Sequence, residues 1–248
     1  MSQIRGILFD SAEVLVYPTV RPGAEPPWRR WFPGPRFEEL VRSEHPDLPS
    51  GDIDPALDAG MAFLDSLDRC DTSEEEIEIW IGFFQVVLAS LGAGHSSDEL
   101  LRSLAEARVF GDQMRPFDDI TDGLPRLRGH GLRLGVLSEA WPSLGWHYAQ
   151  MGLREHFDAF VVSAAEGRLK DDPELFVIAA ARLRLDLAEI LFVDDHPPHV
   201  RTAIATGMKA AVMARGNVPG GITDLDMVRD LAGVECLARE NSVSTSGA

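Results

Sequence analysis

The sequence contains very little lysine: Lys170 and Lys209 are the only two lysines among 248 residues, so arginine supplies the remaining cationic side chains. Basic residues are also outnumbered, with 23 Lys and Arg against 40 Asp and Glu, which gives a formal net charge of −17. A field of this sign repels polyanions, so we expect no nucleic-acid partner. A small phosphorylated ligand is still compatible with it, because a bound cation and one lysine can reverse the potential locally.

Long hydrophobic runs and closely spaced cysteines are absent as well. No apolar segment reaches the roughly 18 residues that a transmembrane helix needs, and the apolar stretch Gly6–Phe9 is too short for a signal-peptide core. We therefore expect no membrane partner and a cytoplasmic location. Cys70 and Cys236 lie far apart without metal-ligand spacing, which is typical of two reduced thiols.

The second half of the chain alternates between strand and helix patterns. Strands are predicted at residues 4–9, 132–137, 160–162, 190–193 and 210–213, and helices at about 120–129, 142–152, 173–184 and 198–206. Repeated strand–helix units favour a parallel sheet with helices on both faces. The predicted fold class is therefore α/β, with a Rossmann-like parallel sheet core.

A segment with a different pattern separates the first strand from this alternation. The proline-rich stretch Tyr17–Arg36 excludes a regular helix or a central strand. Residues 37 to about 110 have helical spacing, and Thr72–Glu76 and Ser96–Glu99 are strong helix starts. We predict an α/β core of residues 1–17 and 112–237, an inserted all-helical domain of residues 18–111, and a disordered tail of residues 238–248.

Five residues whose side chains could take part in a reaction or bind a ligand lie at predicted strand ends or in a neighbouring loop. Asp10, Ser138 and the pair Asp194 and Asp195 each follow a strand, and Lys170 precedes the helix at residue 173. Ligands of open α/β sheets bind beyond the carboxyl ends of the strands. Close carboxylates favour a hard divalent cation such as magnesium, and a carboxylate beside that cation is a competent nucleophile toward phosphorus. The lysine and the hydroxyl are suited to hold phosphoryl oxygens.

Four segments in this order resemble the motifs of the haloacid dehalogenase superfamily, across about residues 4–215. They are Ile7–Leu15, Leu134–Ala140, Gly167–Phe176 and Leu191–Asp195, the last followed by His199–Met208. The resemblance implies a hydrolase, and the helical insert lies where this family places its substrate-covering cap.

The resemblance also implies roles for individual residues. Asp10 is the expected nucleophile and a magnesium ligand, together with Asp195, with Asp194 beside it, and with the backbone carbonyl of Ala12. Lys170 is assigned to catalysis. For binding the substrate we expect Ser138, Glu139 and Lys170.

Several positions depart from the family pattern. Ala12 stands where the family usually has an Asp that acts as general acid and base, and its loss typically costs about 10²–10⁴ in rate. Glu13 replaces a usual Gly, Glu139 a usual Asn and Asp171 a usual Pro, and His199 stands where Asn is common. Glu13, Glu139 and His199 are candidates to replace the missing acid, although a solvated or supporting role is the simpler interpretation of each.

The favoured hypothesis is a magnesium-dependent phosphatase of a small phosphorylated metabolite, acting through an aspartyl phosphate as a monomer or homodimer. One alternative is a catalytically impaired relative with a binding or regulatory role. Another is a 2-haloacid dehalogenase, which the retained Asp194 and Asp195 disfavour. Phosphonoacetaldehyde hydrolase is disfavoured because the insert lacks the required lysine, and a mutase because it relies on the acid and base missing here.

Overall fold

The chain forms two compact units, which we describe separately. The computed structural model describes residues 3–48, 51–67, 69–216 and 223–243. Residues 1–17 and 116–248 make up one unit, called the α/β unit, and residues 18–115 make up the other, called the helical unit. Within the described ranges, no helix is both long and apolar enough to cross a membrane.

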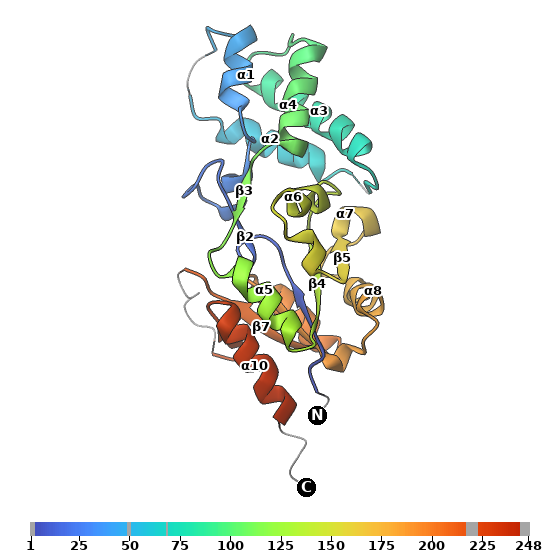
Figure 1. Ribbon diagram of the computed structural model, residues 1–248. Helices are drawn as coiled ribbons and strands as arrows, with labels where there is room; N and C mark the ends of the chain where they lie inside the picture. The colour runs from blue at the N-terminus through green and yellow to red at the C-terminus, as the bar shows by residue number, and fades with distance from the viewer. Residues whose placement is uncertain (1–2, 49–50, 68, 217–222, 244–248) are drawn as a thin grey trace. The chain divides into compact units, whose positions relative to one another are not determined.

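A six-stranded parallel sheet forms the centre of the α/β unit, as the sequence predicts (Figure 1). Its strand order is β5-β4-β1-β6-β7-β8. The bounds are β1 Gly6–Phe9, β4 Arg133–Ser138, β5 Ala159–Val162, β6 Ile190–Asp194, β7 Lys209–Met213 and β8 Asp226–Val228. All four residues of the central strand β1 are buried, which explains why it is apolar throughout rather than alternating. The edge strand β8, which begins with an exposed Asp, was not predicted.

Helices cover both faces of this sheet. They are α5 Ile120–Gly129, α6 Leu144–Gln150, α7 Ser163–Glu166, α8 Pro173–Leu183, α9 Pro197–Ala205 and α10 Leu231–Val243, with 3-10 turns η2 Arg154–His156 and η3 Leu187–Glu189. On one face, α8 and α9 share a core with the strands that includes Leu8, Phe176 and Phe192. On the other face α5 packs against α10, where Gly123 lets the Leu231 side chain approach the α5 backbone closely (Figure 1).

The end of helix α10 corrects one prediction. We expected disorder from residue 238, but α10 continues to Val243, so the prediction is wrong for residues 238–243. Leu231, Val234 and Ala238 are buried at helical spacing, so this apolar stripe anchors the helix despite its polar sequence. Residues 244–248 lie outside the described part of the chain.

The helical unit contains α1 Phe37–Glu44, α2 Asp54–Leu64, α3 Ser73–Ser90 and α4 Asp98–Phe110, with a 3-10 turn η1 Pro27–Trp31. Both predicted helix starts are confirmed. Thr72 and Glu75 form a reciprocal capping box at α3, and the Ser97 hydroxyl accepts from the Leu100 N–H at α4. Trp80 and Phe83 are fully buried on α3, which makes this helix the centre of the unit. The two chain segments that link the units, β2 Val16–Pro18 and β3 Met114–Pro116, form a two-stranded sheet.

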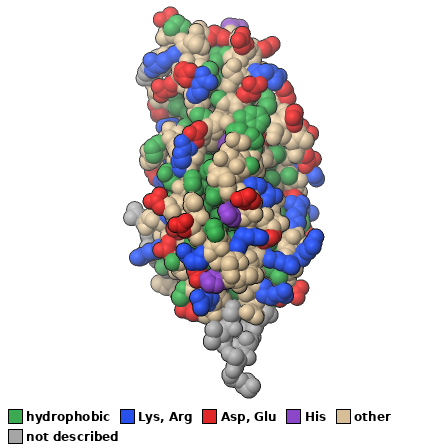
Figure 2. Space-filling model, viewed as in Figure 1, with side chains coloured by type: hydrophobic (Ala, Val, Ile, Leu, Met, Phe, Trp, Pro, Cys, Tyr) green, Lys and Arg blue, Asp and Glu red, His purple; other side chains and the backbone are tan. Residues whose placement is uncertain are grey.

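Charged side chains of both signs are interspersed over the face seen in Figure 2. Many arginines are paired with nearby carboxylates, as in Arg126 with Glu235 at 2.8 Å and Arg128 with Asp158 at 2.9 Å. The acidic excess is thus spread over the surface beside paired cations rather than gathered in one tail.

Candidate active site

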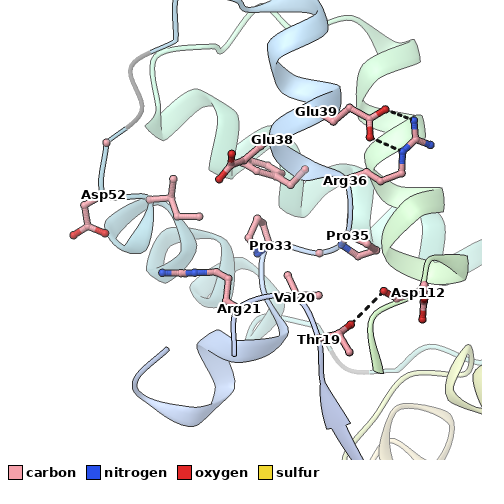
Figure 3. A pocket seen from close by; sticks show the side chains of 14 residues that line it. Thr19, Val20, Arg21, Pro33, Pro35, Arg36, Glu38, Glu39, Asp52 and Asp112 are labelled. Carbon is pink, nitrogen blue, oxygen red and sulfur yellow. Dashed lines mark hydrogen bonds and ion pairs between the residues drawn. The ribbon is translucent and has the colours of Figure 1, made fainter. Parts of the chain in front are cut away.

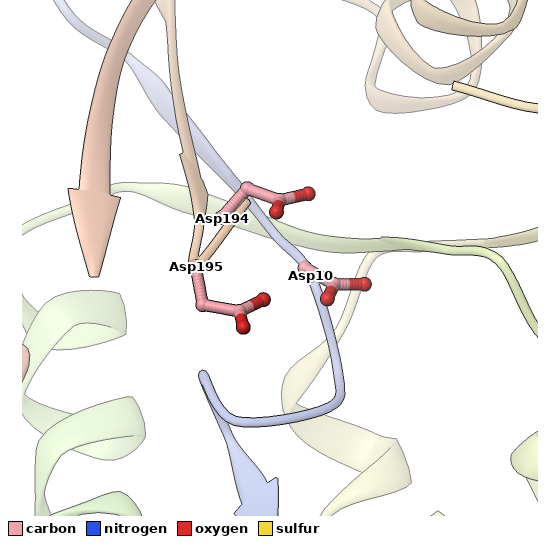
Figure 4. Close-up of side chains that lie close together, drawn as sticks. All are labelled: Asp10, Asp194 and Asp195. Atoms are coloured by element: carbon pink, nitrogen blue, oxygen red, sulfur yellow. The ribbon is translucent and has the colours of Figure 1, made fainter. Parts of the chain in front are cut away.

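Three neighbouring strands of the α/β unit bring Asp10, Ser138 and Asp194 to one edge of the sheet. Phe9 of β1 is paired in register with Val193 of β6, so the residues that follow each of them are neighbours. The Asp10 N–H donates to the Val193 carbonyl at 2.8 Å, which fixes the backbone at Asp10. Figure 4 shows the Asp10 and Asp194 side chains at these adjacent strand ends, together with Asp195.

The carboxylates of Asp10, Asp194 and Asp195 form a cluster suited to a divalent cation. Each offers an oxygen, and the three oxygens lie within 4.8 Å of one another (Figure 4). Burial and the two neighbouring carboxylates raise the pKa of Asp195 to about 7. Burial also raises the pKa of Asp10. The raised pKa values mean that the ionised forms of Asp10 and Asp195 are destabilised, and a nearby cation would stabilise them. A set of three carboxylate oxygens is suited to Mg²⁺.

Lys170 is the cation that the protein itself places in this cluster. Its Nζ lies 2.7 Å from Asp10 Oδ1 and 2.7 Å from Asp194 Oδ2, although Lys170 belongs to a loop and not to a strand end. The residue is 1% exposed. Burial lowers the pKa of Lys170, but the two carboxylates together outweigh burial and raise it, so the ammonium is charged at neutral pH.

The two adjacent aspartates of the fourth motif differ in their surroundings. Asp194 accepts hydrogen bonds at both oxygens, from Lys170 Nζ and from the His196 N–H, each at 2.7 Å. Burial raises the pKa of Asp194, but the charges and hydrogen bonds of Lys170 and His199 outweigh this effect and lower the pKa to about 2. Asp195 has no such donor among the described residues. Asp195 is therefore the carboxylate of the pair that most needs an external cation.

The turn Ser11–Val16 follows Asp10 directly. The Ser11 carbonyl accepts from the Leu15 and Val16 N–H groups at 2.9 and 3.0 Å, and Glu13 donates to the Val16 carbonyl at 2.8 Å. Glu13 has a φ of 56°, a left-handed conformation for which Gly is the usual residue. Ala12 presents only a methyl group here, so its side chain neither donates nor accepts a proton.

Glu139, at the end of β4, makes a contact with the backbone of the lysine loop. Its Oε1 accepts the Lys170 N–H at 2.7 Å, which joins the end of β4 to the lysine loop. Ser138 is 3% exposed at the end of β4, and its role in phosphate binding stays a prediction. The carboxylate of Glu139 thus supports the backbone of Lys170, and its direct contact with substrate stays a prediction.

Two further groups lie at the site: His199, one of the candidates to replace the missing acid, and the hydroxyls of Tyr148 and Ser11, which the sequence did not single out. His199, in the first turn of α9, lies with Nδ1 3.4 Å from Asp194 Oδ2 and Nε2 3.7 Å from Glu139 Oε1. Burial lowers the pKa of His199, but Asp194 raises it by more. The Tyr148 and Ser11 hydroxyls are joined by a buried hydrogen bond of 2.8 Å. His199 could be found from its position just after the aspartate pair, whereas Tyr148 is 137 residues from Ser11 and carries no such signal.

The helical unit contains a cavity of about 510 Å³, drawn in Figure 3. Two of its lining arginines already have partners, since Arg21 pairs with Asp54 at 2.9 Å and Arg36 with Glu39 at 2.7 Å. Figure 3 shows the Glu39 carboxylate facing the Arg36 guanidinium. The cavity is lined by none of the residues that the motifs assign to catalysis.

A comparison of the sequence with known protein families identifies the family of this chain. A family model described as haloacid dehalogenase-like hydrolase matches residues 4–207, which covers all four motifs. The chain belongs to this family. Its α/β core, its inserted helices and its buried aspartate cluster are those of a haloacid dehalogenase-like hydrolase.

Individual relatives are more distant. The chain is 28% identical over 137 residues to a glyceraldehyde 3-phosphate phosphatase of Methanopyrus kandleri, covering 48% of this chain and 59% of the relative. It is 30% identical over 150 residues to a phosphoserine phosphatase of Thermus thermophilus, covering 58% of this chain and 60% of the relative. The chain thus spans about three-fifths of the length of these two phosphatases.

Among solved structures, a 2-haloacid dehalogenase from Pseudomonas syringae pv. tomato has the same fold. The TM-score is 0.66 at 22% identity, and the alignment covers 96% of this chain and 100% of that one. At this identity the likeness concerns the fold alone. The proteins to which this chain is similar thus include two phosphatases by sequence and a 2-haloacid dehalogenase by fold.

Proposed function

We propose that this hydrolase cleaves phosphate monoesters of a small metabolite through an aspartyl phosphate on Asp10, with Mg²⁺ as cofactor. The observation that carries the proposal is the position of Lys170, whose Nζ contacts Asp10 and Asp194 in the same cluster as the Asp195 carboxylate. Asp10, Asp194, Asp195 and the Ala12 carbonyl would hold the cation. When bound, Mg²⁺ would neutralise the carboxylates and the phosphoryl oxygens.

The reaction uses Asp10 as the nucleophile. A carboxylate oxygen of Asp10 forms a bond to phosphorus while the bond from phosphorus to the ester oxygen breaks. The leaving alkoxide takes a proton from solvent. Water then attacks the phosphorus of the aspartyl phosphate, which releases inorganic phosphate and a proton and restores the Asp10 carboxylate. Lys170 and Ser138 hold phosphoryl oxygens through both steps, where negative charge is spread over them.

The first experiment measures hydrolysis of 4-nitrophenyl phosphate with Mg²⁺ by wild type and by Asp10→Asn. Removing a nucleophile should lower turnover by about 10³-fold or more. Asp226→Asn is the matched control, since Asp226 is exposed at the opposite, amino-terminal end of β8. Unchanged turnover in Asp10→Asn would contradict the proposal.

Ala12 gives a second experiment, because its methyl group has no proton for the leaving alcohol. Wild-type rates should rise steeply as the leaving group becomes more acidic, from alkyl to aryl phosphates. Ala12→Asp should accelerate alkyl phosphates by about 10²–10⁴-fold and flatten this dependence. If wild type binds Mg²⁺ but is inert and only Ala12→Asp is active, the chain is instead an impaired relative that binds its ligand.

Dehalogenation is the second candidate. It is supported by the fold shared with a 2-haloacid dehalogenase and by Ala12, because a halide leaves as an anion and needs no proton. Chloride release from (S)-2-chloropropionate without added metal would favour it over phosphate ester hydrolysis.

A further inference from the structure

Arg215, just beyond β7, makes two charge-assisted contacts inside the α/β unit. Its Nε donates to the Val14 carbonyl at 2.7 Å, and its Nη1 pairs with Asp119 Oδ1 at 2.7 Å. The side chain is only 10% exposed, and its Nη2 is buried without a hydrogen-bond partner in the described structure. Burying a guanidinium with one nitrogen unpaired is costly, so its contacts must be held firmly by the surrounding residues.

The partners of Arg215 are themselves tied to other segments. Its guanidinium carbon lies 4.2 Å from the centre of the Phe117 ring, and the Phe117 N–H donates to the Leu15 carbonyl at 3.1 Å. The second oxygen of Asp119 accepts the Leu231 N–H at the start of α10, at 2.7 Å. Arg215 therefore joins β7, the start of α5 and the start of α10 to the Ser11–Val16 turn.

That turn needs external support. It holds Glu13 in the left-handed region, which costs a non-glycine residue about 1–2 kcal/mol. Inside the turn, the Leu15 and Val16 N–H groups donate to the Ser11 carbonyl and the Glu13 N–H donates to the Val16 carbonyl. The Val14 carbonyl instead accepts from Arg215. A hydrogen bond from a charged donor is roughly twice as strong as one between neutral groups.

We propose that Arg215 is a positioning residue for the metal site: it fixes the Ser11–Val16 turn and so sets where the Ala12 carbonyl lies relative to Asp10 and Asp195. The inference rests on the proposed function only in taking the Ala12 carbonyl as a metal ligand. Arg215 does not touch substrate, and it acts through Val14, two residues from Ala12.

The test compares Arg215→Leu, Arg215→Lys and wild type, with Mn²⁺ as the probe. Groups that orient metal ligands typically change affinity by about 10–100-fold, so we expect Arg215→Leu to weaken Mn²⁺ binding, measured by electron paramagnetic resonance, by about 10-fold or more. Arg215→Lys retains a cationic donor and should recover part of that loss. In metal-free Arg215→Leu, the Leu15 and Val16 amides should exchange hydrogen faster than in wild type.

Arg201→Leu is the matched control, because it removes a guanidinium that is 49% exposed and pairs with Asp224 on the surface. It should leave Mn²⁺ affinity and amide exchange unchanged. If Arg215→Leu does not fold, Arg215→Gln replaces it, with an expected weakening of at least about three-fold because the charge is lost.

A lower melting temperature in Arg215→Leu, with wild-type Mn²⁺ affinity and wild-type exchange of Leu15 and Val16, would overturn the inference and leave Arg215 a purely structural residue. That outcome is independent of turnover. Wild-type Mn²⁺ binding without any hydrolysis of phosphate esters overturns the proposed function instead, and the Arg215 comparison still decides the inference.

Discussion

The α/β unit and the helical unit both bury charged side chains, but they arrange them differently. In the α/β unit, the carboxylates of Asp10, Asp194 and Asp195 surround the single ammonium of Lys170. In the helical unit, Glu76 and Arg108 are buried beside one aromatic side chain: Trp80 donates to Glu76 at 3.2 Å, and the Arg108 guanidinium lies 4.5 Å from the centre of its indole ring.

The difference teaches what each cluster is for. Glu76 and Arg108 are one charge of each sign, and the Trp80 ring and the Gln113 side chain contact the guanidinium directly. That group is balanced without a ligand. The α/β cluster has an excess of negative charge, which a bound divalent cation can balance. We therefore expect changes in the Glu76–Arg108 group to affect stability alone, and changes in the aspartate cluster of the α/β unit to affect metal binding and turnover.

Lys170→Met should break the α/β cluster with the largest effect. Turnover should fall by about 10²–10³-fold, since a buried electrostatic contact to the reacting groups is lost. The free energy of unfolding of the metal-free protein at pH 7 should fall by about 3–5 kcal/mol, because two buried carboxylates lose their counter-ion. Urea unfolding and 4-nitrophenyl phosphate assays measure both. Lys209→Met is the control for loss of a lysine, and equal effects of the two changes would contradict the comparison.

The pH dependence of metal-free stability should sharpen the comparison next. The pKa of Asp195 is raised to about 7 in the folded protein, so this carboxyl binds its proton more tightly than in the unfolded chain. Its contribution is fully present below the unfolded pKa, near 4, and is lost as pH rises through 7, by as much as about 4 kcal/mol.

Urea unfolding of the protein in EDTA, followed from pH 4 to 8, measures this loss. Saturating Mg²⁺ should remove it at the upper end of the range, because the cation stabilises the ionised carboxylate. Asp195→Asn should remove it in EDTA, whereas Asp226→Asn should not. A flat profile for wild type in EDTA would contradict the prediction.

Arg108→Met tests the helical unit. Burial lowers the pKa of Arg108 to about 10, and Glu76 partly offsets this, so the guanidinium stays charged. Its removal takes away the positive charge that Arg108 places near the buried Glu76 carboxylate, and the free energy of unfolding should fall by about 3 kcal/mol. Mn²⁺ affinity should stay at the wild-type value. Arg102→Met, on the same helix but in an exposed pair with Glu78, should change stability by less than about 1 kcal/mol.

Tyr148→Phe should give the smallest effect. It removes the hydroxyl that is hydrogen-bonded to Ser11 inside the α/β unit and leaves the ring packing against Phe157 and Phe160. The expected loss of stability is about 1 kcal/mol. Ser11→Ala in the Tyr148→Phe background should then cost less than it does in wild type, and strictly additive losses would show that the hydrogen bond contributes nothing.

Much of the α/β unit is determined by local sequence. The apolar runs that end at Asp10, Ser138 and Asp194 predict parallel strands, and parallel strands necessarily bring their carboxyl ends to one edge. The helix starts at Thr72 and Ser97 are confirmed for an equally local reason, since a capping side chain and the amide it accepts from are three residues apart. Ala12 is visible in the sequence because it is a departure within a short motif.

Only the tertiary structure decided which side chains at that edge of the sheet contact one another. Lys170 contacts Asp10 and Asp194, while Asp195 accepts no side-chain hydrogen bond within the part of the chain that the structure describes. Glu139 accepts the Lys170 N–H, α10 continues past residue 238, and Arg215 donates to the Val14 carbonyl. These contacts join segments up to 201 residues apart. Their geometry depends on side-chain packing across several elements at once, and no local pattern of residues encodes it.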